Sequence, residues 1–304
     1  YLGVHTTSGL LISIASLLAF AQIVDSALGQ ETLAVLDLRL VLADALLAPA
    51  LAAPSAAGAK VGARFDPFAD PVLTHVRIRG HQDGRRVYFA YHGTFYAQVS
   101  GQRTVPMFRI IGASSARMQR QPDGAWLYTM REAGWFCDLA SGEPVNEATN
   151  PLNGKLVKPR HYNSAQQSRF MPNASVAPVI ERPPAGLEYV GTIGRAEADH
   201  DVVWTTEELL VKMPSPTPGA PARVQTSLAT FSASRAELDS SPDAFVGCRL
   251  GYQTLGSFLG WMDMGEATGV ISWRLAGRKS DKVEEIPDAL RARIEREHPE
   301  VLQV

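Results

Sequence analysis

The sequence has few of the residues on which common metal and redox sites depend. Only two cysteines, Cys137 and Cys248, occur in 304 residues, and neither a C-x-x-C pair nor a Cys/His cluster is present to bind a structural zinc ion. In an oxidising compartment the two thiols could pair, and two separately buried thiols are the alternative. A mononuclear metal site on His75, His81 or His92 with a carboxylate is the weaker hypothesis, so we expect no metal.

Motifs for nucleotide binding and for serine hydrolysis are missing as well. No G-x-G-x-x-G segment and no P-loop occurs, so no nucleotide cofactor is expected. Ser114 and Ser115 in "GASSAR" do not form the G-x-S-x-G elbow of serine hydrolases. A basic excess is also lacking, since the formal net charge is −2 and the two signs nearly balance after residue 59. We therefore do not expect nucleic acid as a partner, because binding it requires a basic footprint.

The first fifth of the chain differs from the rest. Residues 1–59 contain a single basic residue, Arg39, and two apolar runs, Gly9–Ala21 and Leu40–Ala59. The second run ends in small residues, as the cleavage region of an export signal does. We therefore predict a leader over residues 1–59, a single domain over residues 60–304 and a periplasmic or secreted location. One alternative is a buried pair of apolar helices. Another is that the two runs are retained and exposed, in which case they would pack against a membrane or a partner.

From residue 72 onward the pattern predicts successive strands joined by tight turns. "VLTHVRIRG" and "VYFAYHGTFYAQV" flank an Asp83-Gly84 hairpin signal, and "QPDG" and "ASGE" mark two further turns. No helix is predicted between these strands, so parallel βαβ winding is not expected. Residues 146–186 are rich in Asn, Pro and Gly and predict a long irregular loop, after which strands resume.

The fold class follows from these strands. Long antiparallel strands must close into a barrel or form a sandwich to hide their edges, and large side chains on both faces favour a barrel with a cavity. We predict a mainly β fold, an antiparallel meander that closes into a barrel-like (calycin-like) domain with a C-terminal helix. Ile286, Leu290 and Ile294 share one stripe of that helix, which should dock on the sheet. A split barrel and a two-sheet sandwich are the alternatives.

Six segments point to a known family when they are taken together and in order. They are "HGTFYA", "MFRIIGASSARM", "REAGWFCDLASGEPV", "NPLNGKLVKPRHYN", "GWMDMGEATGVISWRLAGRK" and "EEIPDAL". Through them the chain resembles the domain of unknown function 1838 family, whose members occur in bacteria and fungi and often carry an export signal. The resemblance covers most of residues 72–300 and implies no established reaction. It supports a mature start near residue 60, because the family's domain begins about there.

The strand from Tyr88 to Val99 carries the first candidate site. Alternation places two sets of side chains on opposite faces of this strand, and neither face is charged. We predict that the polar set looks into the barrel, where His92 and Tyr96 would bind a ligand oxygen or move a proton. The alternative is a ladder of side chains on the outer surface. The other members of the set, predicted to bind the ligand, are Tyr88, Thr94 and Gln98.

The second candidate site lies in the predicted long loop, where His161, Tyr162 and Asn163 follow one another. An imidazole beside a phenol and an amide can serve as a general acid or base near neutral pH. We predict His161 as the acid or base, Tyr162 as a hydroxyl donor and Asn163 as a ligand contact. A histidine that is hydrogen-bonded to the loop backbone is the alternative.

Two further groups of residues complete the candidate site. Arg117 and Glu132 lie on neighbouring predicted strands, where Arg117 would stabilise an anion or oxyanion and Glu132 would serve in catalysis. A purely structural ion pair is the alternative. Arg109 is predicted to bind the ligand. Trp261 and Met262 form an apolar patch, which predicts either a wall for a hydrophobic ligand or part of the core.

Together these features predict an exported barrel that binds a small apolar or aromatic molecule. In the enzymatic version it is a cofactor-independent lyase, isomerase or hydratase that acts by proton transfer. A non-catalytic carrier and a structural subunit associated with a membrane or a partner are the alternatives. The sequence is also compatible with a homo-oligomer.

Overall fold

The computed structural model describes residues 65–214, 222–240 and 243–303. The leader predicted for residues 1–59 lies outside these residues. The helices are α2 (Pro71–Arg79), α3 (Arg235–Leu238) and α4 (Asp288–Glu297), with the 3₁₀ turns η2 (Gly260–Met262), η3 (Val283–Glu285) and η4 (Pro299–Gln303). The strands are β1 (Val87–Val99), β2 (Val105–Arg120), β3 (Trp126–Cys137), β4 (Ala148–Thr149), β5 (Leu156–Val157), β6 (Tyr162–Phe170), β7 (Ser175–Pro178), β8 (Glu188–Ile193), β9 (Glu197–Asp199), β10 (Val202–Met213), β11 (Arg223–Ser234), β12 (Cys248–Gly256) and β13 (Gly269–Ser280).

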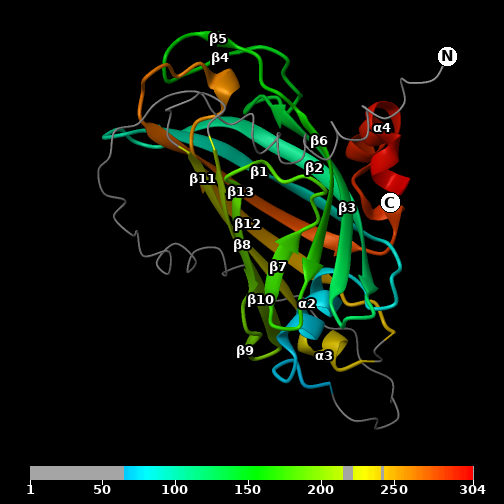
Figure 1. Ribbon diagram of the computed structural model, residues 1–304. Coiled ribbons are helices and arrows are strands. Elements are labelled where there is room, and N and C mark those ends of the chain that lie inside the picture. Colours follow the sequence, from blue (N-terminus) through cyan, green and yellow to red (C-terminus); the bar gives the residue numbers. More distant parts are fainter. Residues whose placement is uncertain (1–64, 215–221, 241–242, 304) are drawn as a thin grey trace, which may run out of the picture.

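The long strands form a closed antiparallel barrel of 10 strands (Figure 1). Around the barrel the order is β10, β11, β12, β13, β1, β2, β3, β6, β7 and β8, and β8 pairs again with β10. The short β9 adds to the edge of β10, and β4 pairs with β5 outside the barrel. The predicted mainly β, barrel-like fold with a C-terminal helix is confirmed. Closure leaves no long unpaired edge, and it encloses the inner set of side chains of every strand.

Residues 71–79 are a helix and not the strand that the sequence predicts. Pro71 occupies the first turn, and the Asp70 carboxylate accepts a hydrogen bond from the Leu73 N–H at 2.9 Å. These two features are the usual start of a helix and outweigh the β-branched residues that follow. The Asp83-Gly84 signal consequently links α2 to β1 and does not close a hairpin.

The segment 146–186 contains two barrel strands, β6 and β7, where the sequence predicts an irregular loop. Strand β6 reads "YNSAQQSRF" and lacks the apolar alternation by which strands are recognised. Its inward residues Tyr162, Ser164, Gln166 and Ser168 line a cavity, so a polar inner face is compatible with its place in the barrel. The prediction was wrong because β6 is composed largely of Asn, Ser and Gln, which are typical of loops, and shows no apolar alternation.

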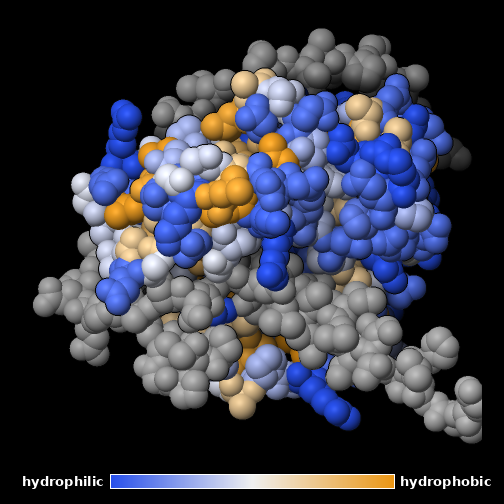
Figure 2. Space-filling model, turned by 90° about the horizontal axis from the view of Figure 1, so that it is seen from above, coloured by the Kyte–Doolittle hydropathy of each residue, from blue (hydrophilic) through white to orange (hydrophobic). Residues whose placement is uncertain are grey.

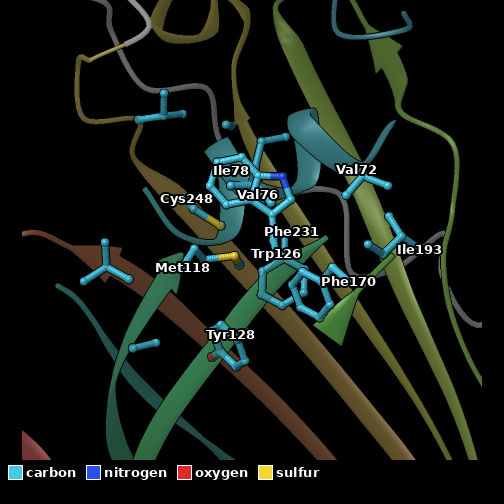
Figure 3. Packing of buried hydrophobic residues seen from close by; sticks show 14 of the residues in the cluster. Val72, Val76, Ile78, Met118, Trp126, Tyr128, Phe170, Ile193, Phe231 and Cys248 are labelled. Atoms are coloured by element: carbon cyan, nitrogen blue, oxygen red, sulfur yellow. The ribbon is translucent and has the colours of Figure 1, made fainter. Parts of the chain in front are cut away.

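Helix α2 closes the lower end of the barrel as a plug (Figure 1). Val72, Val76 and Ile78 on this helix are buried against strand residues that include Trp126 and Phe170. Figure 3 shows side chains of the helix and of the surrounding strands pointing toward one another in this cluster. The plug therefore gives the barrel a floor of packed apolar side chains.

A buried lysine on β13 holds the end of the plug. The ammonium group of Lys279 donates hydrogen bonds to the carbonyl oxygens of Arg77 at 3.0 Å, Ile78 at 2.6 Å and Gly80 at 2.8 Å. These carbonyls belong to the last turn of α2 and to its C-cap, where a helix leaves acceptors without intrahelical partners. Burial lowers the pKa of Lys279 to about 8. A single charged side chain thus satisfies three carbonyls at the point where the plug meets the barrel wall.

The C-terminal helix packs on the outside of the barrel, over β1, β2 and β3 (Figure 1). Ile286, Leu290 and Ile294 are buried there against Tyr88 and Trp135, as the stripe predicts. Both cysteines are buried and free, Cys137 beneath this helix and Cys248 in the cluster around the plug. Among the described residues, no helix is long and apolar enough to cross a membrane.

The upper end of the barrel carries β4, β5 and η2 (Figure 1). Figure 2 looks onto this end and shows hydrophobic and hydrophilic side chains mixed on its left part, with a mainly hydrophilic right part. The Asn150 side chain donates a hydrogen bond to the carbonyl of Met262 at 2.7 Å and ties the loop before β5 to η2. This contact holds Trp261, the neighbour of Met262, against the top of the barrel interior.

Candidate functional site

A cavity of about 220 Å³ lies inside the barrel, between the plug and the upper end. An engineered apolar cavity of about 150 Å³ already binds benzene, so this volume is sufficient for a small organic molecule. The cavity wall has an aromatic upper part, a polar middle and a charged floor.

The upper part of the wall is a buried aromatic cluster. Its rings contact one another edge to face or tilted, with centroids 5.4–6.4 Å apart. The indole N–H of Trp273 is buried and finds no hydrogen-bond partner in the part of the chain that the structure describes. Such groups are rare in native proteins, and a polar ligand atom is one way to satisfy them. The cluster consists of Phe95, Phe108, Phe136, Tyr162, Trp261 and Trp273, of which the last four line the cavity and the first two pack behind them.

Two glycines on the inner wall make room for a pair of tyrosines. Tyr91, Gly112, Gly134 and Tyr162 stand in one row across β1, β2, β3 and β6. A Cβ atom on Gly112 would lie 2.3 Å from the Tyr91 hydroxyl oxygen, and one on Gly134 would lie 2.2 Å from the Tyr162 ring. Each phenol therefore lies flat over a glycine, and the two hydroxyl oxygens meet at 3.0 Å. Larger residues at either glycine would push the phenols into the cavity.

Glu132 occupies the inner wall next to this pair. It pairs with Ser114 on β2 and Ser164 on β6, and its carboxylate accepts hydrogen bonds from the hydroxyl groups of Tyr91 and Ser164. Burial raises the pKa of Glu132, and these two hydrogen bonds oppose the increase only in part. Burial and the Glu132 charge raise the pKa values of Tyr91 and Tyr162 well above their usual range. Glu132 makes no ion pair with any residue that the structure describes.

Substitution of Glu132 should make stability less dependent on pH. Because the folded-state pKa is raised, the stability that Glu132 contributes is fully present below the unfolded pKa of about 4.5 and is lost as the pH rises through the folded pKa. Glutamine does not titrate. We expect Glu132→Gln to match the parent near pH 4 and to have a Tm about 2–4 °C higher at pH 7, equivalent to about 1 kcal/mol. Thermal unfolding followed across this pH range checks the prediction, and a Tm difference that does not change with pH would contradict it.

The floor of the cavity carries a buried ion pair. The guanidinium of Arg79, on the plug, contacts the carboxylate of Glu207 on β10. It also stands over the rings of Tyr128, Phe231 and Phe170, at 4.2, 5.0 and 5.4 Å from their centroids. These contacts join the plug to four strands of the barrel and leave the floor electrically balanced.

A histidine lies behind this floor. His75 Nε2 is 3.3 Å from the Glu207 carboxylate, and its Nδ1 is 2.9 Å from the Thr205 hydroxyl. Burial, followed by the Arg79 charge, lowers the pKa of His75 well below its usual value, so the ring is neutral at pH 7. His75 therefore contributes hydrogen-bonding groups to the floor and no charge.

His161 stands at the cavity wall just before β6. Its Nδ1 accepts a hydrogen bond from the backbone N–H of Phe136 at 3.2 Å. Burial lowers its pKa, so the ring is neutral near pH 7 and carries its proton on Nε2. In this tautomer His161 is a hydrogen-bond donor toward other groups, and its backbone contact is to strand β3 and not to the loop backbone of the alternative hypothesis.

A comparison with protein families gives a match that covers most of the chain. Residues 84–303 match the family described as "Protein of unknown function (DUF1838)". The chain belongs to the DUF1838 family. This confirms the resemblance seen in the sequence. The matched residues include every strand of the DUF1838 barrel but begin after α2, so the plug and Arg79 precede them. No curated protein and no solved structure matches the chain.

Four of the residues predicted for the site line the cavity of the DUF1838 barrel, and they come from three segments of the chain. Glu132 belongs to β3, Tyr162 belongs to β6 with His161 directly before it, and Trp261 lies in η2. Met262, the neighbour of Trp261, is fully buried in the core behind the aromatic cluster and does not line the cavity.

The orientation predicted for β1 is wrong. His92 is exposed, Tyr96 lies under the guanidinium of Arg274 with 4.9 Å between the Arg274 carbon and the ring centroid, and Tyr88 packs under the C-terminal segment. Thr94 is half-buried outside the cavity, and Gln98 bonds to the turn that follows β1. The inner face is the apolar one, and it brings Phe89 and Tyr91 to the cavity. The prediction took the polar face of β1 for the inner one. That face is the outer face, and it carries large side chains because the C-terminal segment partly covers it.

The predicted basic and amide residues also lie outside the barrel. Arg117 pairs with Thr129 in the sheet and points away from the cavity, on the face opposite to that of Glu132, so these two residues form no ion pair. Arg109 is exposed on the outer face. The Asn163 side chain lies 2.7 Å from the Glu300 carboxylate, beside the C-terminal segment.

Sequence reasoning missed Tyr91, Trp273, Arg79 and Glu207. The alternation "VVWTTEELLVKM" places Glu207 in line with Val203 and Thr205, which marks it as an inward carboxylate. No comparable signal marks Arg79, because its segment reads as a strand. Within the described residues, no group of three or more His, Cys, Asp or Glu side chains is arranged to hold a metal ion.

Proposed function

We propose that the DUF1838 barrel binds a small molecule with an aromatic or otherwise apolar part inside its cavity. The observation that carries the proposal is the cavity of about 220 Å³, which has an aromatic cluster at one end and hydrogen-bonding groups along its middle. Ligand sites are typically concave and largely apolar, with a few convergent polar groups that fix orientation. Tyr162 and Trp261 contribute to the apolar part, and Glu132, Tyr91 and Ser164 supply the polar groups.

In the enzymatic version of this proposal the barrel moves a proton and needs no cofactor. A carboxyl group whose pKa is raised by burial, next to two hydrogen-bonded phenols, is suited to lyase or isomerase chemistry. In the binding version the same groups only orient the ligand. The two versions share one site and differ in whether a bond to hydrogen is broken.

A large side chain in the cavity tests the proposal. Ser227 on β11 lines the cavity, whereas its neighbour Thr226 faces outward. We expect Ser227→Trp to weaken the binding of naphthalene, an uncharged bicyclic probe, at least about tenfold, which corresponds to about 1.4 kcal/mol. Thr226→Trp, the matched control, should bind as the parent does. Calorimetric titration measures both affinities, and thermal unfolding shows whether each variant is folded.

Gln225→Phe, a smaller change on the same inner face, replaces Ser227→Trp if that variant does not fold. Equal loss of binding in the inward and outward variants would contradict the proposal. The same conclusion follows if the parent protein binds no uncharged aromatic probe.

A further inference from the structure

Three side chains on the cavity wall form a continuous hydrogen-bonded series. The Tyr162 hydroxyl oxygen lies 3.0 Å from that of Tyr91, and Tyr91 is hydrogen-bonded to the carboxylate of Glu132. All three residues line the cavity. We call this series the relay.

The relay has a direction when Glu132 is ionised. Tyr91 has one hydroxyl proton and donates it to the carboxylate, so its oxygen accepts the proton of Tyr162. The oxygen of Tyr162 then keeps lone pairs but has no proton left to offer. The Tyr162 oxygen, at the cavity end of the relay, is therefore a hydrogen-bond acceptor. The group that satisfies it is a hydrogen-bond donor on the ligand.

We propose that the ligand is a phenol or an enol, and that the relay takes up the proton of its hydroxyl group. This inference rests on the proposed function, since it names the class of molecule that the cavity binds. The ligand O–H bond breaks and its proton passes to the Tyr162 oxygen, the Tyr162 proton passes to Tyr91, and the Tyr91 proton passes to Glu132. At the end both tyrosines are neutral as before, Glu132 is an uncharged acid, and the negative charge lies on the ligand oxygen.

The surroundings of the relay favour a hydroxyl on an unsaturated carbon. The ring of Trp273 contacts that of Tyr162 with 5.5 Å between centroids, and the Trp273 N–H lacks a partner among the described residues. A hydroxyl group can donate to Tyr162 and accept from an N–H at the same time. Trp261 and Phe136 provide flat apolar surfaces against which a conjugated ring or enol can pack.

The charges around Glu132 allow it to gain a proton. Burial raises its pKa, which brings its proton affinity closer to that of an acidic hydroxyl. Arg79 is the cation whose charge acts on Glu132, and it is already paired with Glu207. The titratable and charged groups that share the cavity wall with Glu132 come from seven parts of the chain. They are Arg79 on α2, Tyr91 on β1, Tyr128 on β3, Arg160, His161 and Tyr162 before and on β6, Tyr189 on β8, Glu207 on β10 and Tyr252 on β12.

A series of ring-substituted phenols, with 4-nitrophenol as the most acidic member, tests the inference. The phenolate and the neutral phenol have different absorption spectra, so the spectrum of the bound probe reports its protonation state directly. Each probe is added at a pH below its solution pKa, where the free molecule is mostly neutral. We expect the parent protein to bind 4-nitrophenol as the phenolate and the least acidic phenols in neutral form.

The relay variants separate proton transfer from simple binding. Glu132→Gln and Tyr91→Phe should still bind 4-nitrophenol but with a phenolate fraction about tenfold lower, because the proton has no acceptor at the end of the relay. Tyr162→Phe should also lower the affinity, because Tyr162 touches the ligand. Tyr189→Phe, a matched control on another strand of the wall, should keep the phenolate spectrum.

Each remaining outcome overturns a defined part of the inference. If 4-nitrophenol binds in neutral form to the parent protein, the relay does not transfer the proton, although the cavity still binds aromatic molecules. A phenolate spectrum that persists in Tyr91→Phe and Glu132→Gln would likewise show that the relay does not transfer the proton. If no phenol binds while naphthalene does, the ligand class is wrong and the proposed function stands.

Discussion

Lys279→Met is expected to lower the free energy of unfolding by about 3 kcal/mol, the largest loss from a single position outside the cavity. The ammonium group donates to three carbonyls at the end of α2, at distances of 2.6–3.0 Å. Hydrogen bonds to charged groups contribute about 1.5–3 kcal/mol each, and a buried acceptor left without a partner costs a further 1–3 kcal/mol. Burial of the thioether of methionine offsets part of this loss. Denaturant unfolding at pH 7, where Lys279 is charged, measures the difference.

Lys282→Met is the control for this substitution. It removes the same charge three residues along the chain, but the side chain of Lys282 is exposed. Exposed substitutions of this kind change stability by no more than about 0.5 kcal/mol. A loss below about 1 kcal/mol in Lys279→Met would mean that water or other donors satisfy the three carbonyls, and that Lys279 does not hold the plug.

The barrel could be predicted from the sequence because most of its strands obey the rules of local patterning. The turns at Gln121–Gly124 and Ala140–Glu143 separate segments with strong β-forming residues, and the structure has β2 and β3 around the first of them. The helical stripe of Ile286, Leu290 and Ile294 was sufficient to place α4 on the sheet. The prediction failed at α2, where signals for the start of a helix compete with β-branched residues. It also failed at β6, because the sequence of that strand shows no apolar alternation.

The cavity could be predicted only in part, because alternation along a strand divides its residues into two faces without saying which is inside. For β1 both faces are rich in large residues, and the covering of the outer face by the C-terminal segment made that face resemble a site. His161 and Tyr162 were found by their chemistry in spite of a wrong secondary structure. Tyr91 was not, because its role depends on two glycines in other strands, Gly112 and Gly134. Such a row becomes visible only when the register of the sheet is known.

The ion pair on the cavity floor leads to the second large effect. Glu207→Gln should lower the free energy of unfolding by about 3–5 kcal/mol, because it leaves the guanidinium of Arg79 buried without a counter-charge. The second single variant is Arg79→Met, and the double variant Arg79→Met with Glu207→Gln removes both charges while most of the side-chain volume remains. The double variant should therefore lose less stability than the sum of the two single losses, by at least about 1 kcal/mol. Denaturant unfolding of the four proteins of this cycle measures the coupling.

An exposed ion pair on the same strand provides the comparison. Lys212 on β10 contacts Glu188 on β8 at 2.6 Å, and both side chains are largely exposed. Glu188→Gln should change stability by less than about 1 kcal/mol, since solvent screens such pairs. If Glu207→Gln changed the stability as little as Glu188→Gln, the floor would be open to water. The cavity would then not be the low-dielectric site that raises the pKa of Glu132. The substitutions of Glu207 on β10 and Glu188 on β8 therefore test the physical condition on which the relay depends. A neutral, closed floor leaves Glu132 as the carboxylate without an ion-pair partner among the described residues that line the cavity.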